Sequence, residues 1–142
     1  MVVKVIDHGF KNYTDAMKAL NTKVIAVGLF AGVGDSVLKK AIYNEFGTKN
    51  IPERSFLRST FNKEYKKVAG RFTQIVKGIN KKDYRVQSKL KLIGVEQVEQ
   101  VQQTITDIKT PPNAESTIRR KGSSNPLIDT GEMRSKISSE VR

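Results

Sequence analysis

The chain turns a corner at Asn44-Glu45-Phe46-Gly47-Thr48-Lys49-Asn50-Ile51-Pro52-Glu53-Arg54-Ser55-Phe56-Leu57-Arg58. Gly47 can adopt the left-handed backbone that ends a helix, because it has no Cβ to clash. Pro52 cannot continue a preceding helical turn but suits the first position of a new helix. Phe56 and Leu57 then begin a long run of helical periodicity. The sequence therefore predicts a helix end, a turn and a helix start within this one stretch.

Two long helices follow the corner, at about 54–79 and 84–108. Apolar residues recur in both at spacings of three and four, which is typical of a helix with one buried face. The polar turn at 80–83 is short, so the two helices are predicted to form an antiparallel hairpin. The first apolar stripe comprises Leu57, Phe61, Tyr65, Val68, Phe72, Ile75 and Ile79, and the second comprises Leu90, Ile93, Val98, Val101, Ile105 and Ile108.

The first stripe has two interpretations. Core packing is the principal one, and it makes Phe61 and Phe72 core residues. The alternative is that part of the stripe packs against a neighbouring subunit.

Strand patterns lie on either side of these helices. Residues 23–30 are nearly all apolar, which is typical of a strand buried on both faces. Gly28 would weaken this strand or mark a bulge or close approach. Residues 137–141 could form a final strand that pairs with it and satisfies its backbone groups. Another short strand is indicated by Val2, Val3, Val5 and Ile6, with Lys4 on the alternate side.

Two short helices are predicted before the corner. The first starts with Asn12 or Thr14 as its cap, and the second starts with Asp35 or Ser36 and stops at Gly47. The apolar face of the first comprises Tyr13, Met17 and Leu20, and that of the second comprises Leu38, Ala41, Ile42 and Phe46. The predicted fold is α+β, a small mainly antiparallel sheet packed with two long helices and short helices. Residues 1–142 form a single domain, within which 110–126 is a loop-rich segment.

The composition limits the classes of function. The chain has 142 residues, no cysteine and a net charge of +12 with a pI near 10.0. Disulfides and cysteine-ligated metals are therefore excluded, and no apolar run reaches the length of a membrane span. Lys4 and Asp7 interrupt any signal peptide, so we expect a soluble protein that is not exported by the general route. Such a positive charge favours nucleic acid, an anionic surface or an acidic protein as partner.

The positive charge is concentrated between Phe61 and Lys91, where only Glu64 and Asp83 oppose it. The turn between the two long helices is expected to project from the domain. Its cations would then form a candidate binding surface for DNA or for an acidic neighbouring protein. A solvated helix face is the alternative interpretation. The candidate basic residues around the turn are Lys77, Lys81, Lys82, Arg85 and Lys89.

Catalytic patterns are weak. His8 is the only histidine, so neither a Ser-His pair nor a histidine zinc site can be assembled, and the glycines of 31–35 lack the rest of a phosphate-binding motif. The run Leu127-Ile128-Asp129-Thr130-Gly131 matches the active-site loop of aspartic proteases, but those enzymes are almost wholly β and need two such aspartates. Asp129 as an N-cap, with Glu132 three residues later, predicts a helix start instead. We expect no enzyme, metal, cofactor or small-molecule substrate.

Two segments of the chain resemble one family. Ala41-Ile42-Tyr43-Asn44-Glu45-Phe46-Gly47-Thr48 followed by residues 51–58 is similar to a signature of small tailed-bacteriophage neck and tail-completion proteins. Residues 111–123 followed by Pro126-Leu127-Ile128-Asp129-Thr130-Gly131-Glu132-Met133-Arg134 resemble a second signature of the same proteins, in the same order and at a similar spacing. The candidate interface residues from these motifs are Asn44, Glu45, Phe46, Gly47, Pro52, Arg54, Phe56, Leu57, Arg58, Lys121, Asp129, Thr130 and Gly131.

The resemblance implies a structural virion protein at the head–tail joint. Such a protein forms a ring of six copies, with twelve as the alternative, between a head-closure or connector protein and a tail-terminator or tail-tube protein. DNA passes nearby, and the protein would be found in the virion neck or tail and, during assembly, in the host cytoplasm. Two alternatives are a minor tail protein and a basic nucleic-acid-binding module. The few aromatic residues lie mostly on the apolar stripe, so base-stacking platforms are not evident.

Overall fold

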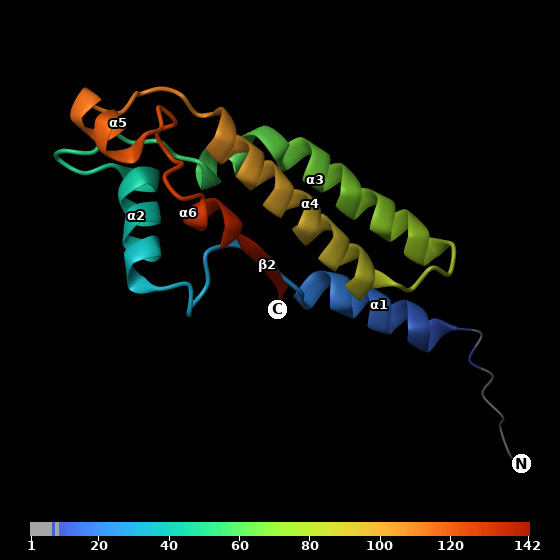
Figure 1. Cartoon of the computed structure of the whole chain (residues 1–142). Coiled ribbons are helices and arrows are strands. Elements are labelled where there is room, and N and C mark those ends of the chain that lie inside the picture. Colours follow the sequence, from blue (N-terminus) through green and yellow to red (C-terminus); the bar gives the residue numbers. More distant parts are fainter. Residues whose placement is uncertain (1–6, 8) are drawn as a thin grey trace, which may run out of the picture.

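Two long antiparallel helices, α3 (Leu57–Asn80) and α4 (Val86–Asp107), form the axis of the molecule (Figure 1). The structure is a computed structural model that describes residues 7 and 9–142. The other elements are α1 (Phe10–Thr22), β1 (Ile25–Gly28), α2 (Asp35–Phe46), α5 (Glu115–Lys121), α6 (Glu132–Ser135) and β2 (Ser138–Val141). The predicted α+β class and the helix hairpin are confirmed. The strand predicted at residues 2–6 lies outside the described residues.

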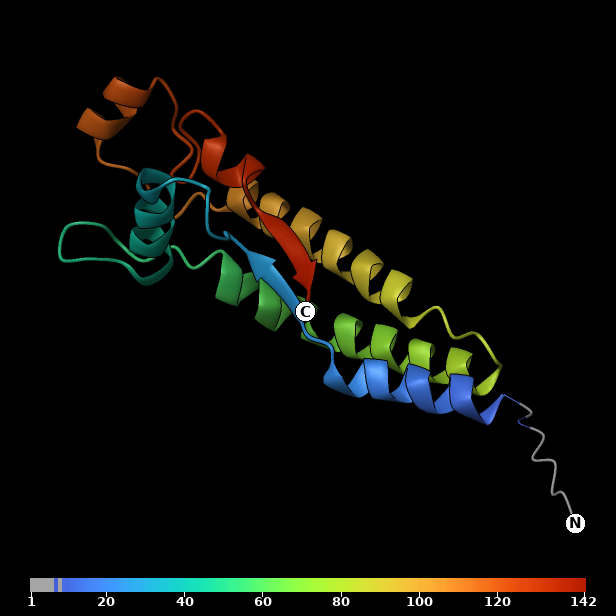
Figure 2. The ribbon, with the colours of Figure 1, turned by 90° about the horizontal axis from the view of Figure 1, so that it is seen from below.

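The sheet pairs the two strands that the sequence predicts to pair. β1 and β2 are antiparallel, with Ile25 opposite Val141 and Gly28 opposite Ser138. They lie against α4, and Figure 2 shows them side by side over the helices. The prediction of burial on both faces is wrong, since Ile25 and Val27 are only half-buried and Val24 is exposed. Among the described elements, α4 is the helix that packs extensively on the two strands, so the sheet is not enclosed between two layers.

The core divides into two clusters along the hairpin. The cluster near the corner, which we call the corner core, contains Val37, Ala41, Phe56, Val101, Ile105, Leu127, Met133 and Ile137. The cluster near the hairpin turn, the tip core, contains Ala16, Ile75, Ile79, Val86, Leu90 and Ile93. Helix α4 contributes to both clusters, so it connects the two halves of the molecule. Its predicted stripe is confirmed, with Val98 and Ile108 partly buried against the corner core.

The stripe of α3 is only half-confirmed. Ile75 and Ile79 are buried and Phe72 is partly buried, but Phe61 is 63% exposed and Tyr65 is 59% exposed. Helix α1 packs on the later turns of α3, and no described element covers the turns that carry Phe61 and Tyr65. The prediction that Phe61 is a core residue is therefore wrong for the described chain.

Helix α2 buries a different face from the predicted one. Val37, Ala41 and Glu45 are buried, whereas Ile42 and Phe46 are exposed. Gly47 ends the helix with a positive φ of 73°, as predicted, but its ψ of 170° differs from that of the left-handed helical conformation. A Cβ on Gly47 would lie 3.0 Å from the backbone nitrogen of Glu53, so the loop also needs glycine there for its close approach.

Several predicted helix starts are displaced. The carboxylate of Asp7, and not Asn12 or Thr14, accepts the first backbone N–H groups of α1, those of Gly9, Phe10 and Lys11. Gly34 is the N-cap of α2, and no described side chain, including those of Asp35 and Ser36, makes a capping hydrogen bond to the first turn of this helix. Helix α3 starts at Leu57, so Pro52 lies in irregular chain before it.

The C-terminal segment also differs in two places. Residues 110–126, predicted to be loop-rich, include the seven-residue helix α5. Helix α6 has Gly131 as its N-cap, with φ of 80°, and the hydroxyl of Thr130 accepts the N–H of Glu132 at 3.3 Å. Asp129 is exposed and is not the cap, so the capping prediction is wrong. The prediction of a helix after Gly131 is confirmed.

Candidate functional site

A buried carboxylate fastens the corner. Glu45, on the last turn of α2, is only 4% exposed. Its Oε2 accepts the N–H groups of Phe56 at 2.8 Å and Leu57 at 2.9 Å, and its Oε1 accepts the N–H of Arg58 at 3.0 Å. These N–H groups begin α3 and have no partner within the helix, and the helix dipole favours a negative charge there. Glu45 thus fixes the start of α3 against the end of α2.

Arg58 completes the contact around Glu45. Its Nε donates to Glu45 at 3.1 Å, and its other donors reach the carbonyl of Glu45 and, at 2.8 Å, the carboxylate of Glu53. The hydrogen bond with Glu45 raises the pKa of the Arg58 guanidinium above its ordinary value. The guanidinium carbon lies 4.9 Å from the centre of the Phe46 ring, which is exposed to solvent beside it. This contact accounts for an exposed aromatic ring at Phe46.

Arg54 joins the corner to a distant segment. It is 5% exposed, and burial lowers the pKa of its guanidinium. Nε donates to the carbonyl of Pro111 at 2.7 Å, and a terminal nitrogen donates to that of Pro112 at 2.9 Å. The remaining terminal nitrogen donates to the side-chain oxygen of Asn44 at 3.3 Å, and the Arg54 N–H donates to the Asn44 carbonyl at 2.7 Å. Arg54 therefore ties together segments up to 58 positions apart.

Lys121 organises the second segment. Its Nζ donates to the carbonyl of Asn125 at 3.0 Å and approaches that of Pro126 at 3.4 Å. Burial lowers the pKa of Lys121, while the charge of Asp129 acts in the opposite direction. The side chain of Asn125 accepts the N–H groups of Leu127 and Ile128, which holds the loop in place before α6.

The two segments enclose a common hollow of about 530 Å³. Its wall carries the cations Lys40, Arg54, Arg120 and Lys121 against the anions Asp129 and Glu132. The side-chain nitrogen of Asn113, also in the wall, is buried and has no hydrogen-bond partner among the residues that the structure describes. Of the residues predicted from the motifs, those that line the hollow are Asn44, Pro52, Arg54, Lys121, Asp129, Thr130 and Gly131.

The other predicted motif residues do not line this hollow. Glu45, Phe56, Leu57 and Arg58 form the junction between α2 and α3, and Gly47 shapes the adjoining loop. The side chains that line the hollow offer hydrogen bonds and charges of both signs.

The predicted basic tip is partly neutralised. Asp83 binds Arg85 at 2.9 Å and Lys89 at 2.7 Å. Hydrogen bonds from Arg85 and Lys89 hold the pKa of Asp83 well below its usual range. Lys77, Lys81 and Lys82 are exposed and form no ion pair with any residue that the structure describes. The cationic surface at the tip is therefore narrower than predicted.

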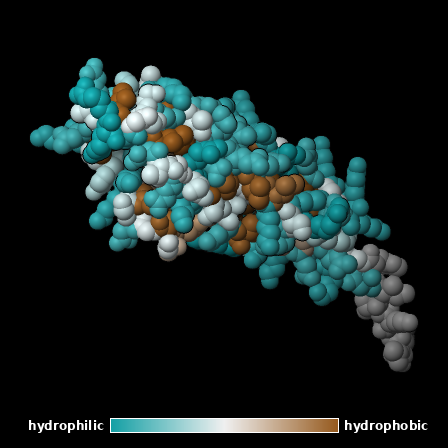
Figure 3. Space-filling model, in the orientation of Figure 1, coloured by the Kyte–Doolittle hydropathy of each residue, from teal (hydrophilic) through white to brown (hydrophobic). Residues whose placement is uncertain are grey.

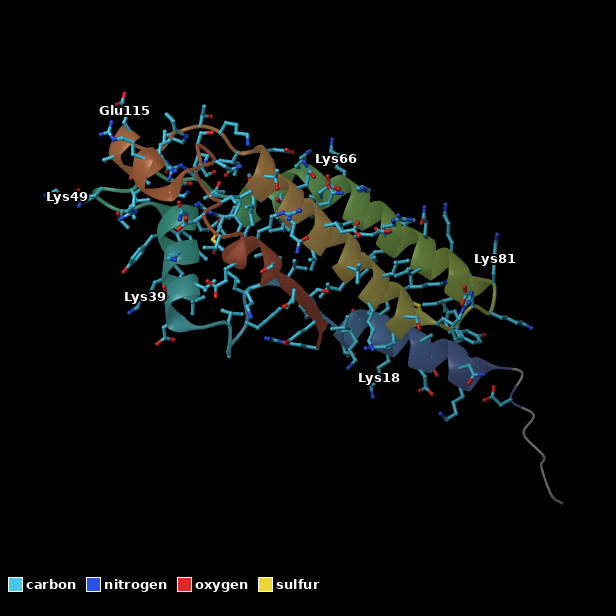
Figure 4. The ribbon with its side chains drawn as sticks, in the orientation of Figure 1. Lys18, Lys39, Lys49, Lys66, Lys81 and Glu115 are labelled. Carbon is cyan, nitrogen blue, oxygen red and sulfur yellow. The ribbon has the colours of Figure 1, made fainter. Side chains whose placement is uncertain are left out.

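A longer cationic surface runs along α3. Lys63, Lys66, Lys77 and Lys81 follow one another at spacings of three, eleven and four residues, which are close to whole helical turns. All four are exposed, and within residues 7 and 9–142 none has an ion-pair partner. Figure 4 shows Lys66 and Lys81 projecting from α3 on the side away from α1. We call these four residues the lysine face. The spacing was present in the sequence, and an analysis by helical position would have found it.

No family model, curated protein or solved structure matches the chain significantly. The phage resemblance therefore stays a prediction from the residues quoted above. Within the described part of the chain, no three acidic or histidine side chains gather closely enough to hold a metal ion. None of the helices described is both long and apolar enough to cross a membrane.

Proposed function

We propose that this protein is a structural component of a tailed-bacteriophage virion, a neck or tail-completion protein that forms a ring at the head–tail joint. The observation that carries the proposal is the junction at Arg54. The two segments that resemble the family are far apart in the sequence, yet Arg54 of the first donates to Pro111 and Pro112 of the second. Motif residues that meet around one hollow are expected if the motifs serve one surface for a partner.

The hollow suits a protein partner. Its wall alternates cations, anions and small turn residues at the end of the molecule where α2, α5 and α6 gather (Figure 1). A loop of a neighbouring copy, or of a head-closure, connector, tail-terminator or tail-tube protein, could bind there through hydrogen bonds and charge. In a ring of six copies, or twelve, the lysine face could border the path of the DNA. The protein would then be found in virions and, before assembly, in the host cytoplasm.

Disruption of the coding sequence in the phage that carries it tests the proposal. We expect filled heads and separate tails to accumulate, and complementation to restore tailed particles. The hollow is tested with Arg120→Glu, and Lys18→Glu, exposed on α1, serves as the matched control. The hollow variant should reduce the yield of joined particles at least tenfold, and the control should not. Normal tailed virions after disruption, or virions that lack this chain, would contradict the proposal.

A basic nucleic-acid-binding module is the second candidate, because the lysine face leaves three cations exposed along α3 and a fourth at its C-cap, Lys81. Such binding would weaken steeply with salt, since released counterions dominate its free energy. Washing purified particles at high salt separates the two functions. A structural protein stays with the particles, whereas a simple nucleic-acid binder is removed. Replacing Lys63, Lys66, Lys77 and Lys81 with glutamine should abolish DNA retention only in the second case.

A further inference from the structure

An apolar groove of about 680 Å³ runs beside the sheet, between β1, α3 and α4. Val24, Ile25 and Val27 form one wall, and Leu57, Phe61 and Phe72 contribute to the opposite wall. Val24 and Phe61 are both more than 60% exposed, which leaves large apolar side chains open to solvent. Figure 3 shows that hydrophobic patches elsewhere also interrupt a largely hydrophilic surface, so exposure alone does not distinguish the groove.

The backbone of β1 distinguishes it. Val24 exchanges both of its backbone hydrogen bonds with Arg142, at 2.9 Å each, and the register continues with Ala26 opposite Glu140. In an antiparallel pair, alternate residues direct their N–H and C=O groups to opposite edges. The peptide groups of Ile25 and Val27 therefore face the edge away from β2. No strand occupies that edge among the described residues. Within the described part of the chain, the groove thus combines an apolar floor with peptide groups that no strand pairs, which is the arrangement that accepts an added strand.

We propose that residues 2–6 of a neighbouring copy of this chain fill the groove as a third strand beside β1. Val2-Val3-Lys4-Val5-Ile6 is rich in β-branched residues and has the length of an ordinary strand. In an extended conformation Val3 and Val5 share one side, which would face Phe61 and its neighbours in the groove. Lys4 would lie on the other side, toward solvent. The added strand would pair with the free groups of Ile25 and Val27.

Within one chain, the linker between residues 2–6 and α1 is too short for these residues to pair along their own β1. Helix α1 has 13 residues, or about 20 Å of length. Its start lies near the hairpin turn, where Gly9 approaches Tyr84, and its end leads into β1 (Figure 2). For residues 2–6 to lie along β1 of the same chain, residues 7–9 alone would have to span the distance to α1, and three residues extend over at most about 10 Å, about half the length of α1. A strand that pairs along β1 must therefore come from another copy.

The inference rests on the proposed function only in that both require copies of the chain to associate. It adds a direction to that association. Each copy would donate a strand from the hairpin-tip end of its own α1 to the middle of the next copy, where Ile25 and Phe61 lie. Donor and acceptor surfaces are different, so the contact is head-to-tail, and such contacts close into rings when the rotation between copies allows it.

Disulfide trapping between two differently tagged chains tests the proposal, because the natural sequence has no cysteine. One chain carries Val3→Cys and the other carries Phe61→Cys. We expect most of the mixed chains to form an interchain disulfide under mild oxidation, seen on non-reducing gels and located by mass spectrometry. Val3→Cys mixed with Lys49→Cys, on the exposed loop of the opposite end (Figure 4), should give at least tenfold less product.

A second experiment tests whether residues 2–6 occupy the groove of their own chain. It uses one chain that carries both Val3→Cys and Phe61→Cys and is oxidised at high dilution. Formation of an intrachain disulfide in a monomer would overturn the proposal, and so would absence of the interchain product in concentrated mixtures. Sedimentation gives an independent measurement. Val3→Asp with Val5→Asp should abolish association, while Lys4→Asp should preserve it. Circular dichroism spectra and melting curves check that each variant folds, and association that survives the double substitution would also contradict the proposal.

The inference and the proposed function fail in different ways. Virions that incorporate the Val3→Cys and Phe61→Cys chains but show no disulfide between positions 3 and 61 would overturn the added strand and leave the virion role standing. Disulfide-linked chains that never enter virions would support the added strand and overturn the virion role.

Discussion

Gly94 of α4 lies directly against Ser139 of β2. A Cβ built on Gly94 would be 2.8 Å from the Ser139 hydroxyl oxygen and 3.0 Å from its Cβ, and 3.4 Å from a methyl carbon of Ile25. The two distances to Ser139 are shorter than ordinary van der Waals contact, so the sheet packs on α4 at a position where only glycine fits without movement. A close approach was one of the interpretations of Gly28, but a Cβ there would meet no described atom within 4 Å, and the close approach is found at Gly94 instead.

We expect Gly94→Ala to destabilise the protein by about 1–3 kcal/mol, because overpacking outweighs the better helix propensity of alanine. Gly70→Ala is the matched control. Gly70 lies within α3, and nothing stands within 4 Å of where its Cβ would be. That substitution should stabilise by up to about 1 kcal/mol. Urea unfolding of both variants measures the difference, and equal effects would contradict the close approach.

Truncation to alanine should cost far more unfolding free energy at Phe56 than at Phe61. Phe56 is fully buried in the corner core, so Phe56→Ala should cost about 3–5 kcal/mol of unfolding free energy. Phe61 is 63% exposed, so Phe61→Ala should cost less than about 1 kcal/mol when the chain is monomeric. Thermal melts at low protein concentration distinguish the two. A large loss for Phe61 under those conditions would mean that some part of the chain covers it.

Because Glu45 caps α3, its replacement should lower the free energy of unfolding strongly, although glutamate is ordinarily a surface residue. Glu45→Ala would leave three N–H groups of α3 without their acceptor and should cost about 2–4 kcal/mol. Glu53→Ala removes the more exposed acceptor of Arg58 and should cost less than about 1 kcal/mol. Denaturant titrations at neutral pH compare them. Similar losses would show that the corner does not depend on the buried carboxylate.

Asp83 should contribute to the sensitivity of the fold to acid. Arg85 and Lys89 hold its pKa below the ordinary value of an aspartate, about 3.9. A depressed pKa in the folded state gives stability that is present above the unfolded pKa and is lost as pH falls toward the folded one. Asp83→Asn should therefore weaken the protein at pH 6 and lose less stability than the wild type between pH 5 and pH 3. Parallel pH profiles for the two proteins would contradict this assignment.

The helix hairpin and the pairing of the sheet could be predicted because they depend on periodicity. The spacing of Leu90, Ile93, Val101 and Ile105 specifies one face of α4, and that face is buried in the structure. Strand 137–141 was predicted to pair with β1 because a strand needs partners for its backbone. These features follow from local patterns and from the hydrogen-bonding requirement, so they need no knowledge of the surroundings.

The same patterns could not predict which part of each apolar helix face is covered by another element. Periodicity identifies Phe61 and Tyr65 as members of the α3 stripe, but it does not say whether another element reaches them. Glu45 presents the converse case. An acidic residue on a short helix is ordinarily exposed, and its burial depends on the three N–H groups that the next helix presents to it.

The individual residues of the candidate site could be predicted from the sequence, but the contacts between them could not. The resemblance singled out Arg54 and Lys121, yet nothing in the spacing shows that Arg54 donates to the carbonyls at Pro111 and Pro112. The basic tip was overestimated because the sequence shows that Asp83 lies among the cations but not that it binds two of the five. Contacts between residues so distant in the sequence depend on the folded geometry of the whole hairpin.

The register that sets Ile25 opposite Val141 has a consequence for the time course of folding. During synthesis β1 emerges early, but its partner strand follows only after α3 and α4 have been made. Closing so long a loop is slow, so we expect the helix hairpin to form first and to serve as the platform on which the strands meet. Pulsed hydrogen exchange should show protection in α4 before the amide of Val24 is protected. Until then both edges of β1 are open, and a nascent chain in that state is the one most exposed to mispairing on a crowded ribosome.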